Sequence, residues 1–291
     1  MTPRANDSGA HRAGTLYVVA TPIGNLEDFS PRAARVLREV DLIAAEDTRR
    51  VAKLLAAHGI SKPTMSFHAY SGEAKLRAII ERLAAGDDVA LVSDAGTPCV
   101  SDPGAEIVAA AWEIGARVVP IPGPCAAIVA LAVAGFAAGR FFFAGYPPRR
   151  GSERRRLLET ALSAPWPAVF YESPERLAKL LDDIAAIAGA DRLALVAREL
   201  TKLHEELARG PIGELAREFA ARAVKGEVTV VVAGASEAPE RAGAVSPREL
   251  ARWLAEEGLG PGRIAAALTR FCGLPRAKAY EIARAARDAG K

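Results

Sequence analysis

Acidic side chains and small residues gather in residues 89–104, a stretch whose residue types and spacing could support chemistry. It begins with the apolar run Val89–Val92, which predicts a buried parallel strand. Asp94 and Asp102 follow among two breaks made of Gly and Pro, and Gly96 permits a positive φ and a close approach of the backbone. Open α/β sheets bind ligands at the carboxyl ends of their strands. The stretch therefore predicts a ligand-binding loop rather than a plain connection.

A second polar cluster follows residues 41–45, which are also predicted to form a strand. It holds Glu46, Asp47 and Arg49. Acids and an arginine at the end of a strand form a polar cluster on the same predicted sheet edge as the other loops, which favours a functional role. The same residues would also make a capped helix start with a solvated face. The sequence leaves both interpretations open.

Two more loops of small residues follow predicted strands, at 16–20 and 117–121. The second loop opens a helix, and the free N–H groups and positive dipole end of a helix suit an anion. None of the loops matches the GxGxxG or P-loop motifs. The loop residues predicted to contact a ligand are Pro22, Ile23, Gly24, Asp94, Ala95, Gly96, Thr97, Pro124, Cys125, Ala126 and Ala127.

Strand and helix patterns alternate through the first half of the chain, which predicts an α/β domain with these loops at one sheet edge. The predicted strands are 16–20, 41–45, 65–67, 89–92 and 117–121. The predicted helices are 50–57, 73–85 and 105–114, with one more starting at Ser30 and another ending near Gly135.

A second α/β domain is predicted after residue 138, with strands at 140–145, 168–171, 193–197 and 228–233 and a helix at 212–223. No element is assigned to residues 203–211. Tyr171 and Glu199 lie where two of these strands end, so we expect them to complete a ligand pocket between the two domains.

Residues 246–291 are predicted to form a small helical module. Three amphipathic helices are predicted, at 247–257, 263–271 and 277–286. The predicted domains are a flexible tail (1–13), an N-terminal α/β domain (14–138), a second α/β domain (139–235), a linker (236–245) and a helix-turn-helix-like module (246–291).

Composition narrows the class of protein. The chain has 291 residues, a formal net charge of +3 and three widely spaced cysteines. No Cys/His spacing typical of a zinc site or a disulfide framework is present, so no metal is expected. No apolar run reaches the length of a membrane span, and the cytoplasm is the expected compartment.

Basic residues concentrate in two places that could contact nucleic-acid phosphates. The first is the run Arg149, Arg150, Arg154, Arg155 and Arg156, which a solvated helix start would also explain. The second is the helical module, where the candidates for RNA contact are Arg276 and Lys278.

Seven short motifs together resemble a known family. They are TPIGNL (21–26), AEDTR (45–49), SDAGTP (93–98), PGPCA (122–126), FYES (170–173), ARELTK (197–202) and KGE (225–227). The chain resembles the bacterial 16S ribosomal RNA (cytidine-2′-O)-methyltransferases of the tetrapyrrole methylase superfamily, over nearly its whole length from Leu16. This resemblance implies two α/β domains of tetrapyrrole-methylase type with S-adenosylmethionine in the cleft between them. It also implies a homodimer and a decoding-centre cytidine of the small ribosomal subunit as substrate.

The resemblance leaves the general base undetermined. Methyl transfer from a sulfonium to a 2′-hydroxyl needs both partners oriented and benefits from a proton acceptor. The candidates are the acids Glu46, Asp47, Asp94 and Glu199 and the cations Arg49, Arg198 and Lys202. Two other functions stay open: a small-molecule tetrapyrrole (precorrin-type) methyltransferase, and an RNA-binding assembly factor without activity.

Overall fold

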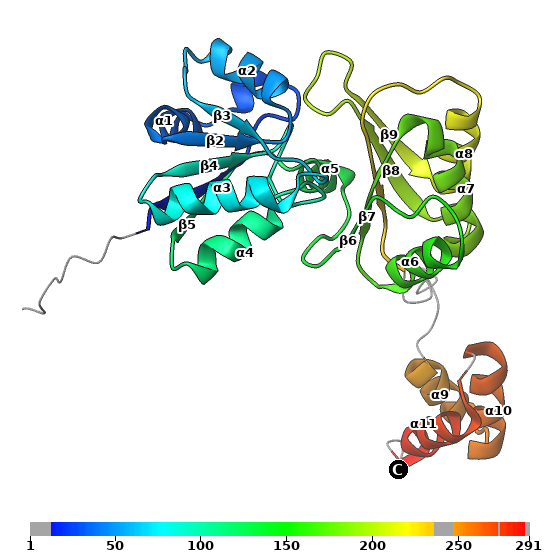
Figure 1. Cartoon of the computed structure of the whole chain (residues 1–291). Coiled ribbons are helices and arrows are strands. Elements are labelled where there is room, and N and C mark those ends of the chain that lie inside the picture. Colours follow the sequence, from blue (N-terminus) through cyan, green and yellow to red (C-terminus); the bar gives the residue numbers. More distant parts are fainter. Residues whose placement is uncertain (1–12, 236–246, 273, 289–291) are drawn as a thin grey trace, which may run out of the picture. The chain divides into compact units, whose positions relative to one another are not determined.

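A computed structural model describes residues 13–235, 247–272 and 274–288 (Figure 1). The chain divides into two compact units, residues 1–235 and 236–291, and each is described here by itself. Residues 1–12 of the expected tail and all of the expected linker lie outside the described residues.

The first unit begins with a fully parallel sheet of order β3-β2-β4-β1-β5. Its strands are β1 (Thr15–Val19), β2 (Leu42–Ala45), β3 (Thr64–Ser66), β4 (Val89–Val92) and β5 (Arg117–Ile121). All residues of β2 and β4 are buried, because helices cover both faces of the sheet. Helices α1 (Pro31–Glu39) and α2 (Thr48–Ala57) pack on one face, and α3 (Glu73–Ala84) and α4 (Ala105–Glu113) pack on the other.

The second sheet of this unit is mixed, with the order β6-β7-β10-β8-β9. Its strands are β6 (Phe142–Gly145), β7 (Ala168–Glu172), β8 (Leu193–Arg198), β9 (Glu206–Pro211) and β10 (Val228–Val232). Three helices cover one face of it (Figure 1), and these are α6 (Ser152–Ser163), α7 (Leu177–Ala188) and α8 (Ile212–Ala220).

Strand β9 was missed by the sequence analysis, which assigned no element to residues 203–211. It pairs antiparallel with β8 over six residues. Its sequence ELARGP contains charges, Gly and Pro, and no residue of it is fully buried. An edge strand tolerates such residues because it has a partner on one side only. Its apolar pattern is therefore too weak to be recognised.

Helix α5 (Ala126–Ala134) joins the two sheets. It follows β5 of the first sheet and lies against the second sheet, on the face opposite α6, α7 and α8 (Figure 1). Ala130 and Leu131 pack there against Leu195 and Val231. Gly135 ends the helix in the left-handed conformation, which suits glycine. This shared apolar core holds the loops of the first sheet against the strands of the second.

The second unit is a three-helix cluster of α9 (Pro247–Glu256), α10 (Pro261–Cys272) and α11 (Arg276–Asp288). Its own small core includes Ala251, Ile264 and Leu268. The three expected helices agree with these within a few residues. No helix in the part of the chain that the structure describes is long and apolar enough to cross a membrane.

Candidate active site

The three loops that follow β1, β4 and β5 are joined by hydrogen bonds. The N–H of Thr21 donates to the carbonyl of Gly96 at 2.8 Å, and the N–H of Gly96 returns a bond to Thr21 at 3.0 Å. The hydroxyl of Thr97 donates to the carbonyl of Pro124 at 3.0 Å. The loops converge because parallel strands end at one edge of the sheet. The three loops therefore lie together at one edge of the first sheet.

The loop after β2 joins the same group through Asp94. The backbone N–H of Asp47 donates to Asp94 Oδ1 at 2.9 Å, and Arg50 Nη1 lies 3.4 Å from Asp94 Oδ2. Asp94 is therefore a junction between two loops as well as a wall of the site. Arg50 was not among the sequence candidates, although it directly follows Arg49.

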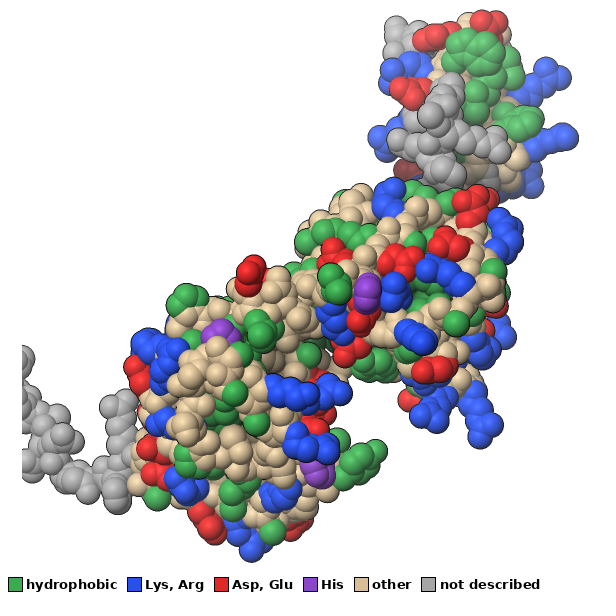
Figure 2. Space-filling view, turned by 90° about the horizontal axis from the view of Figure 1, so that it is seen from above, with side chains coloured by type: hydrophobic (Ala, Val, Ile, Leu, Met, Phe, Trp, Pro, Cys, Tyr) green, Lys and Arg blue, Asp and Glu red, His purple; other side chains and the backbone are tan. Residues whose placement is uncertain are grey.

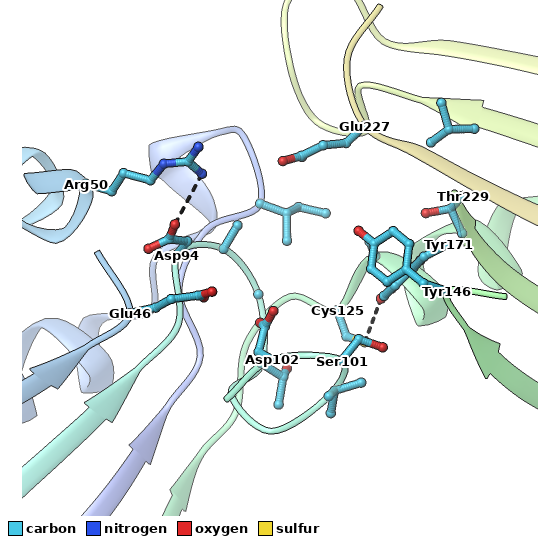
Figure 3. Close-up of a pocket in the computed structure, with 17 residues that line it drawn as sticks. Glu46, Arg50, Asp94, Ser101, Asp102, Cys125, Tyr146, Tyr171, Glu227 and Thr229 are labelled. Carbon is cyan, nitrogen blue, oxygen red and sulfur yellow. Dashed lines mark hydrogen bonds and ion pairs between the residues drawn. The ribbon is translucent and has the colours of Figure 1, made fainter. Parts of the chain in front are cut away.

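A cavity of about 230 Å³ opens where these loops face the second sheet (Figure 3). The first half of the unit contributes loop residues, and the second half contributes Tyr146, Tyr171 and residues of β10. We call it the first pocket. It is lined by Ile23, Glu46, Arg50, Asp94, Ala95, Gly96, Thr97, Val100, Ser101, Asp102, Cys125, Ala126, Tyr146, Tyr171, Glu227, Val228 and Thr229.

Carboxylates dominate the charge of the first pocket. Four acidic residues line it, with Arg50 as the one cation. Burial, together with the negative charge of Glu46, raises the pKa of Asp102 to about 6. Burial and the neighbouring Asp94 also raise the pKa of Glu46 above its ordinary value. Both pKa values are raised because burial disfavours the charged form first, and repulsion between neighbouring carboxylates adds to it.

A strained loop presents Asp102 to this pocket. Cys99 and Ser101 have positive φ angles of 68° and 65°, a region that residues with a side chain rarely occupy. Gly104 follows with φ 122°, and a Cβ there would come within 2.6 Å of the Leu91 side chain. Figure 3 shows Ser101 and Asp102 projecting from this loop at the pocket. Strain of this kind is typical of sites where side-chain placement matters more than stability.

Tyr171 lines the first pocket beside the start of helix α5. Its hydroxyl accepts the N–H of Ala127 at 3.0 Å and lies 3.8 Å from Cys125 Sγ. Burial raises the pKa of Tyr171 well above its ordinary value. One N–H group at the start of α5 therefore already has a hydrogen-bond acceptor, the Tyr171 hydroxyl. The sequence analysis expected such N–H groups to be free for an anion. Ala127 itself is buried and does not line the pocket.

Asp47 and Arg49 form the start of helix α2 rather than a wall of the pocket. Asp47 is the N-cap and accepts the backbone N–H of Arg49, whose guanidinium also binds it. Hydrogen bonds from Arg49 lower the pKa of Asp47 to about 2. The Arg49 side chain is 88% exposed. Of the expected catalytic cluster, only Glu46 lines the pocket, and the capped-helix interpretation fits the other two residues.

Glu199 and Lys202 form an ion-pair network beside the first pocket. Lys202 Nζ lies 2.7 Å from Glu199 Oε1 and 3.0 Å from Glu227 Oε2. Glu199 also accepts the N–H of Glu227 at 3.0 Å. Glu199 does not line either large cavity of this site, so the structure does not support direct contact with a ligand there.

A second pocket of about 280 Å³ adjoins the first. It is lined by Thr21, Pro22, Ile23, Gly24, Leu26, Arg50, Val51, Lys53, Leu54, Ser93, Asp94, Ala95, Lys202 and Glu227. The two pockets share Arg50, Asp94 and Glu227, so they are two parts of one larger site. Pro22 and Gly24, expected to contact the ligand of the first pocket, line only the second.

The expected RNA contacts differ in exposure. Arg154 is a correction: its side chain is only 6% exposed, and it binds Asp183 at 2.8 Å and the carbonyl of Pro148. Its guanidinium also lies beside Glu172, which is fully buried. The remaining residues are exposed, and they are Arg149, Arg150, Arg155, Arg156, Arg276 and Lys278. On the face of the first unit that Figure 2 views, acidic and basic side chains are interspersed rather than sorted by sign.

Arg50 is not the one lining residue without an assignment from the sequence, and Asp102, Glu227 and Tyr146 are further examples. Asp102 stood in the stretch 89–104, and Glu227 stood in the KGE motif, so both could have been selected. Tyr146 follows β6 and had no distinguishing motif. Among the described residues, no group of His, Cys, Asp and Glu side chains is arranged to hold a metal ion.

A family profile decides the classification. The profile described as Tetrapyrrole (Corrin/Porphyrin) Methylases matches residues 15–216, more than half of the chain. The chain belongs to the tetrapyrrole methylases.

Three relatives of high identity carry the name "Ribosomal RNA small subunit methyltransferase I". The protein of Xylella fastidiosa is 43% identical over 92% of this chain and 98% of its own length. The protein of Pseudomonas aeruginosa is 47% identical over 84% of this chain and 88% of its own length. The protein of Thermotoga maritima is 48% identical over 76% of this chain and 99% of its own length.

Solved structures agree with the tetrapyrrole methylase fold. A cobalt precorrin-4 methyltransferase has a TM-score of 0.59 at 16% identity, covering 75% of this chain and 94% of that one. A uroporphyrin-III C-methyl transferase from Thermus thermophilus, complexed with S-adenyl homocysteine, has a TM-score of 0.56 at 18% identity, covering 76% and 97%. At these identities the likeness shows the fold alone.

Proposed function

We propose that this chain transfers a methyl group from S-adenosylmethionine to the 2′-hydroxyl of a decoding-centre cytidine in the 16S ribosomal RNA of the small subunit. The observation that carries this proposal is the set of relatives at 43% to 48% identity, each named for methylation of small-subunit ribosomal RNA. The joined loops and the first pocket supply a site of the required kind.

The first pocket suits the cationic groups of S-adenosylmethionine in its charge. A sulfonium and an ammonium group would lie among four carboxylates, Glu46, Asp94, Asp102 and Glu227, to which a cation is attracted. Gly96, with φ 87°, lets the loop backbone approach a ligand closely. The residues that would hold the cofactor are Ile23, Asp94, Ala95, Gly96, Thr97, Cys125, Ala126 and Tyr171.

The bound cofactor supplies an activated methyl group, and the chain's own residues orient the acceptor, exclude water and take up a proton. Two carboxylates in the first pocket, Glu46 and Asp102, could take up that proton. Asp102 suits the task because a pKa of about 6 leaves it ionised at neutral pH, yet more basic than an ordinary carboxylate. Arg50 and Lys202 are close enough to the same site to stabilise negative charge on the substrate.

A tetrapyrrole methyltransferase is the alternative, since solved structures of that class share the fold. Their identity of 16% to 18% is far below that of the relatives named for ribosomal RNA. The exposed arginines beside α6 and the separate helical unit also favour a large anionic substrate.

The deciding experiment offers tritiated S-adenosylmethionine to the full chain with one of two acceptors. These are small ribosomal subunits from cells lacking this methyl group, and a precorrin-type tetrapyrrole. Label in a single ribose of the subunit RNA is the expected result, whereas label in the tetrapyrrole alone would reject the proposal. We propose, from the family resemblance, that the chain acts as a homodimer, which sedimentation of the same preparation measures.

A further inference from the structure

The second pocket differs from the first in the sign of its charge. Its walls carry three cations, Arg50, Lys53 and Lys202, against two carboxylates, Asp94 and Glu227. The first pocket has four carboxylates against Arg50 alone. Two adjoining cavities with opposite charge suit two ligands of opposite charge, because each ligand is attracted to one cavity and repelled from the other.

The cations of the second pocket have donors to spare. Lys53 has no ion-pair or hydrogen-bond partner among the described residues. An ammonium group has three donors, and Lys202 uses two of them on Glu199 and Glu227. Arg50 makes one exposed ion pair at 3.4 Å, which is weak in water and leaves the guanidinium available to another anion.

Apolar residues complete the second pocket. Pro22 and Leu54 line it, and Leu26 lies half exposed at its wall. A phosphate ion alone would gain nothing from these groups, whereas a nucleotide presents a sugar and a base beside its phosphate. The combination of cations and apolar side chains therefore favours a nucleotide over a free anion.

We propose that the second pocket binds an RNA phosphate and its adjoining nucleotide, next to the nucleotide whose 2′-hydroxyl enters the first pocket. Lys53 and Arg50, both from α2, and Lys202, from the loop after β8, hold this phosphate. The shared wall of Arg50, Asp94 and Glu227 sets the distance between the phosphate and the reacting hydroxyl. This inference rests on the proposed function and names where its substrate lies.

Replacement of Lys53 tests the assignment in the full chain. Lys53 is exposed, so Lys53→Ala leaves the fold intact. We expect binding to unmethylated small subunits to weaken about three- to tenfold, and the slope of log affinity against log salt to flatten by about 0.7. Lys53→Glu weakens binding further, and Lys53→Arg retains it. KM for the subunit rises while kcat stays within about twofold, because the contact is made before and during the reaction alike.

The control is Arg77→Ala, which removes an exposed cation from α3 that lines none of the described pockets. It leaves both affinity and salt slope unchanged. Calorimetry with S-adenosylmethionine gives the same affinity for wild type and all Lys53 variants.

Two results would overturn the assignment. One is wild-type subunit affinity and salt slope for both Lys53→Ala and Lys53→Glu, and the other is a loss of S-adenosylmethionine affinity in these variants. Failure of the proposed function looks different, because wild-type protein would then leave subunit RNA unlabelled whatever residue stands at position 53.

Discussion

At the scale of single residues, burial and neighbouring charges set the pKa of each acid in the site. Asp102 was one of two carboxylates in the stretch 89–104, and the structure shows that it projects into the first pocket beside Glu46. Its pKa is raised first by burial and then by Glu46, which is a cost to the folded protein at neutral pH. Asp47, by contrast, has a lowered pKa and caps a helix. Neighbouring carboxylates thus have different roles because of what surrounds them.

Asp102→Asn removes the proposed proton acceptor. Because the pKa of Asp102 is about 6, the wild-type methylation rate should rise from pH 5 to pH 7 as the carboxylate ionises, and then level off. In Asp102→Asn the rate falls by roughly a hundredfold and loses that dependence. Asp47→Asn is the matched control, since its carboxylate caps α2 and lies outside the first pocket. Equal rates for Asp102→Asn and wild type would exclude Asp102 as the base.

The same variant should change stability in the opposite direction. The pKa of Asp102 is raised above its ordinary value of 3.8, so the protonated acid stabilises the folded state at low pH. That contribution is lost as the pH rises through 6. Asn cannot ionise, so Asp102→Asn is more stable than wild type at pH 8, on the order of 1 kcal/mol after allowance for solvent screening. Urea unfolding without cofactor measures the difference, and lower stability of the variant at pH 8 would contradict it.

At the scale of elements, loops and buried pairs hold the site in place. The loops after β1 and β4 are tied by the paired bonds of Thr21 and Gly96. On the other side, Arg154 links helix α6 to Glu172 at the end of β7 and to Asp183 on α7. Neither contact touches the pocket's ligand space directly. Both fix backbone segments from which lining residues project.

Gly96→Val should abolish binding of S-adenosylmethionine while the chain still folds. A Cβ at this position meets Ile23 at 3.4 Å, which is tolerable, but φ 87° is strained for valine. That strain would either destabilise the native loop by roughly 1–2 kcal/mol or be relieved by a movement of the loop away from Thr21. Gly115→Val is the matched control, because Gly115 has φ 72° with open space around it and lies before β5, at the opposite sheet edge. Calorimetry should show loss of affinity in the first variant only.

Arg154→Met tests whether this arginine is structural. Removing it leaves the buried carboxylate of Glu172 with one fewer counter-charge, so the free energy of unfolding should fall by about 3 kcal/mol. Arg156→Met is its control, as the side chain is exposed and no ion pair of it occurs in the described part of the chain. That variant keeps its stability and weakens binding to small subunits. If Arg154→Met has the same free energy of unfolding in urea as the wild type, the contacts of Arg154 with Glu172 and Asp183 do not stabilise the fold.

At the scale of the whole molecule, the chain forms two compact units. The first holds both pockets, and the second has its own core and exposed basic residues such as Arg276. The Thermotoga maritima relative is matched over 99% of its length by only 76% of this chain. A protein of that name is therefore shorter than this chain by about the size of the second unit.

A chain ending at Ala235 should fold and bind S-adenosylmethionine as tightly as the full chain, because both pockets are complete within it. It should lose most of its affinity for small subunits, since two tethered weak contacts reinforce each other. The full-length variant with Arg276→Ala and Lys278→Ala should lose part of that affinity and flatten the salt dependence. Paired calorimetry and subunit binding across a salt series decide the outcome. If the shortened chain binds subunits with the same affinity and slope, the second unit has another role.

Local patterns in the sequence were sufficient to predict most elements. The buried runs of β2 and β4 lack polar residues. Ser30 is the N-cap of α1 and Pro31 its first residue. These elements could therefore be predicted from neighbouring residues alone. The Gly and Pro loops after β1, β4 and β5 followed from the same rules. Strand β9 could not be predicted in this way because an edge strand needs little apolar character, and its pairing with β8 is a tertiary contact.

The roles of charged residues were decided by tertiary structure. The sequence placed Glu46, Asp47 and Arg49 together, but the direction of each side chain separates a pocket acid from a helix cap. The run around Arg154 looked uniformly exposed until the packing of α6 on the second sheet buried one arginine against Glu172. The sequence determines which residue types follow each strand and so can contribute to the site. Burial and the distances between charges, which set pKa values and free donors, arise only when distant segments pack together.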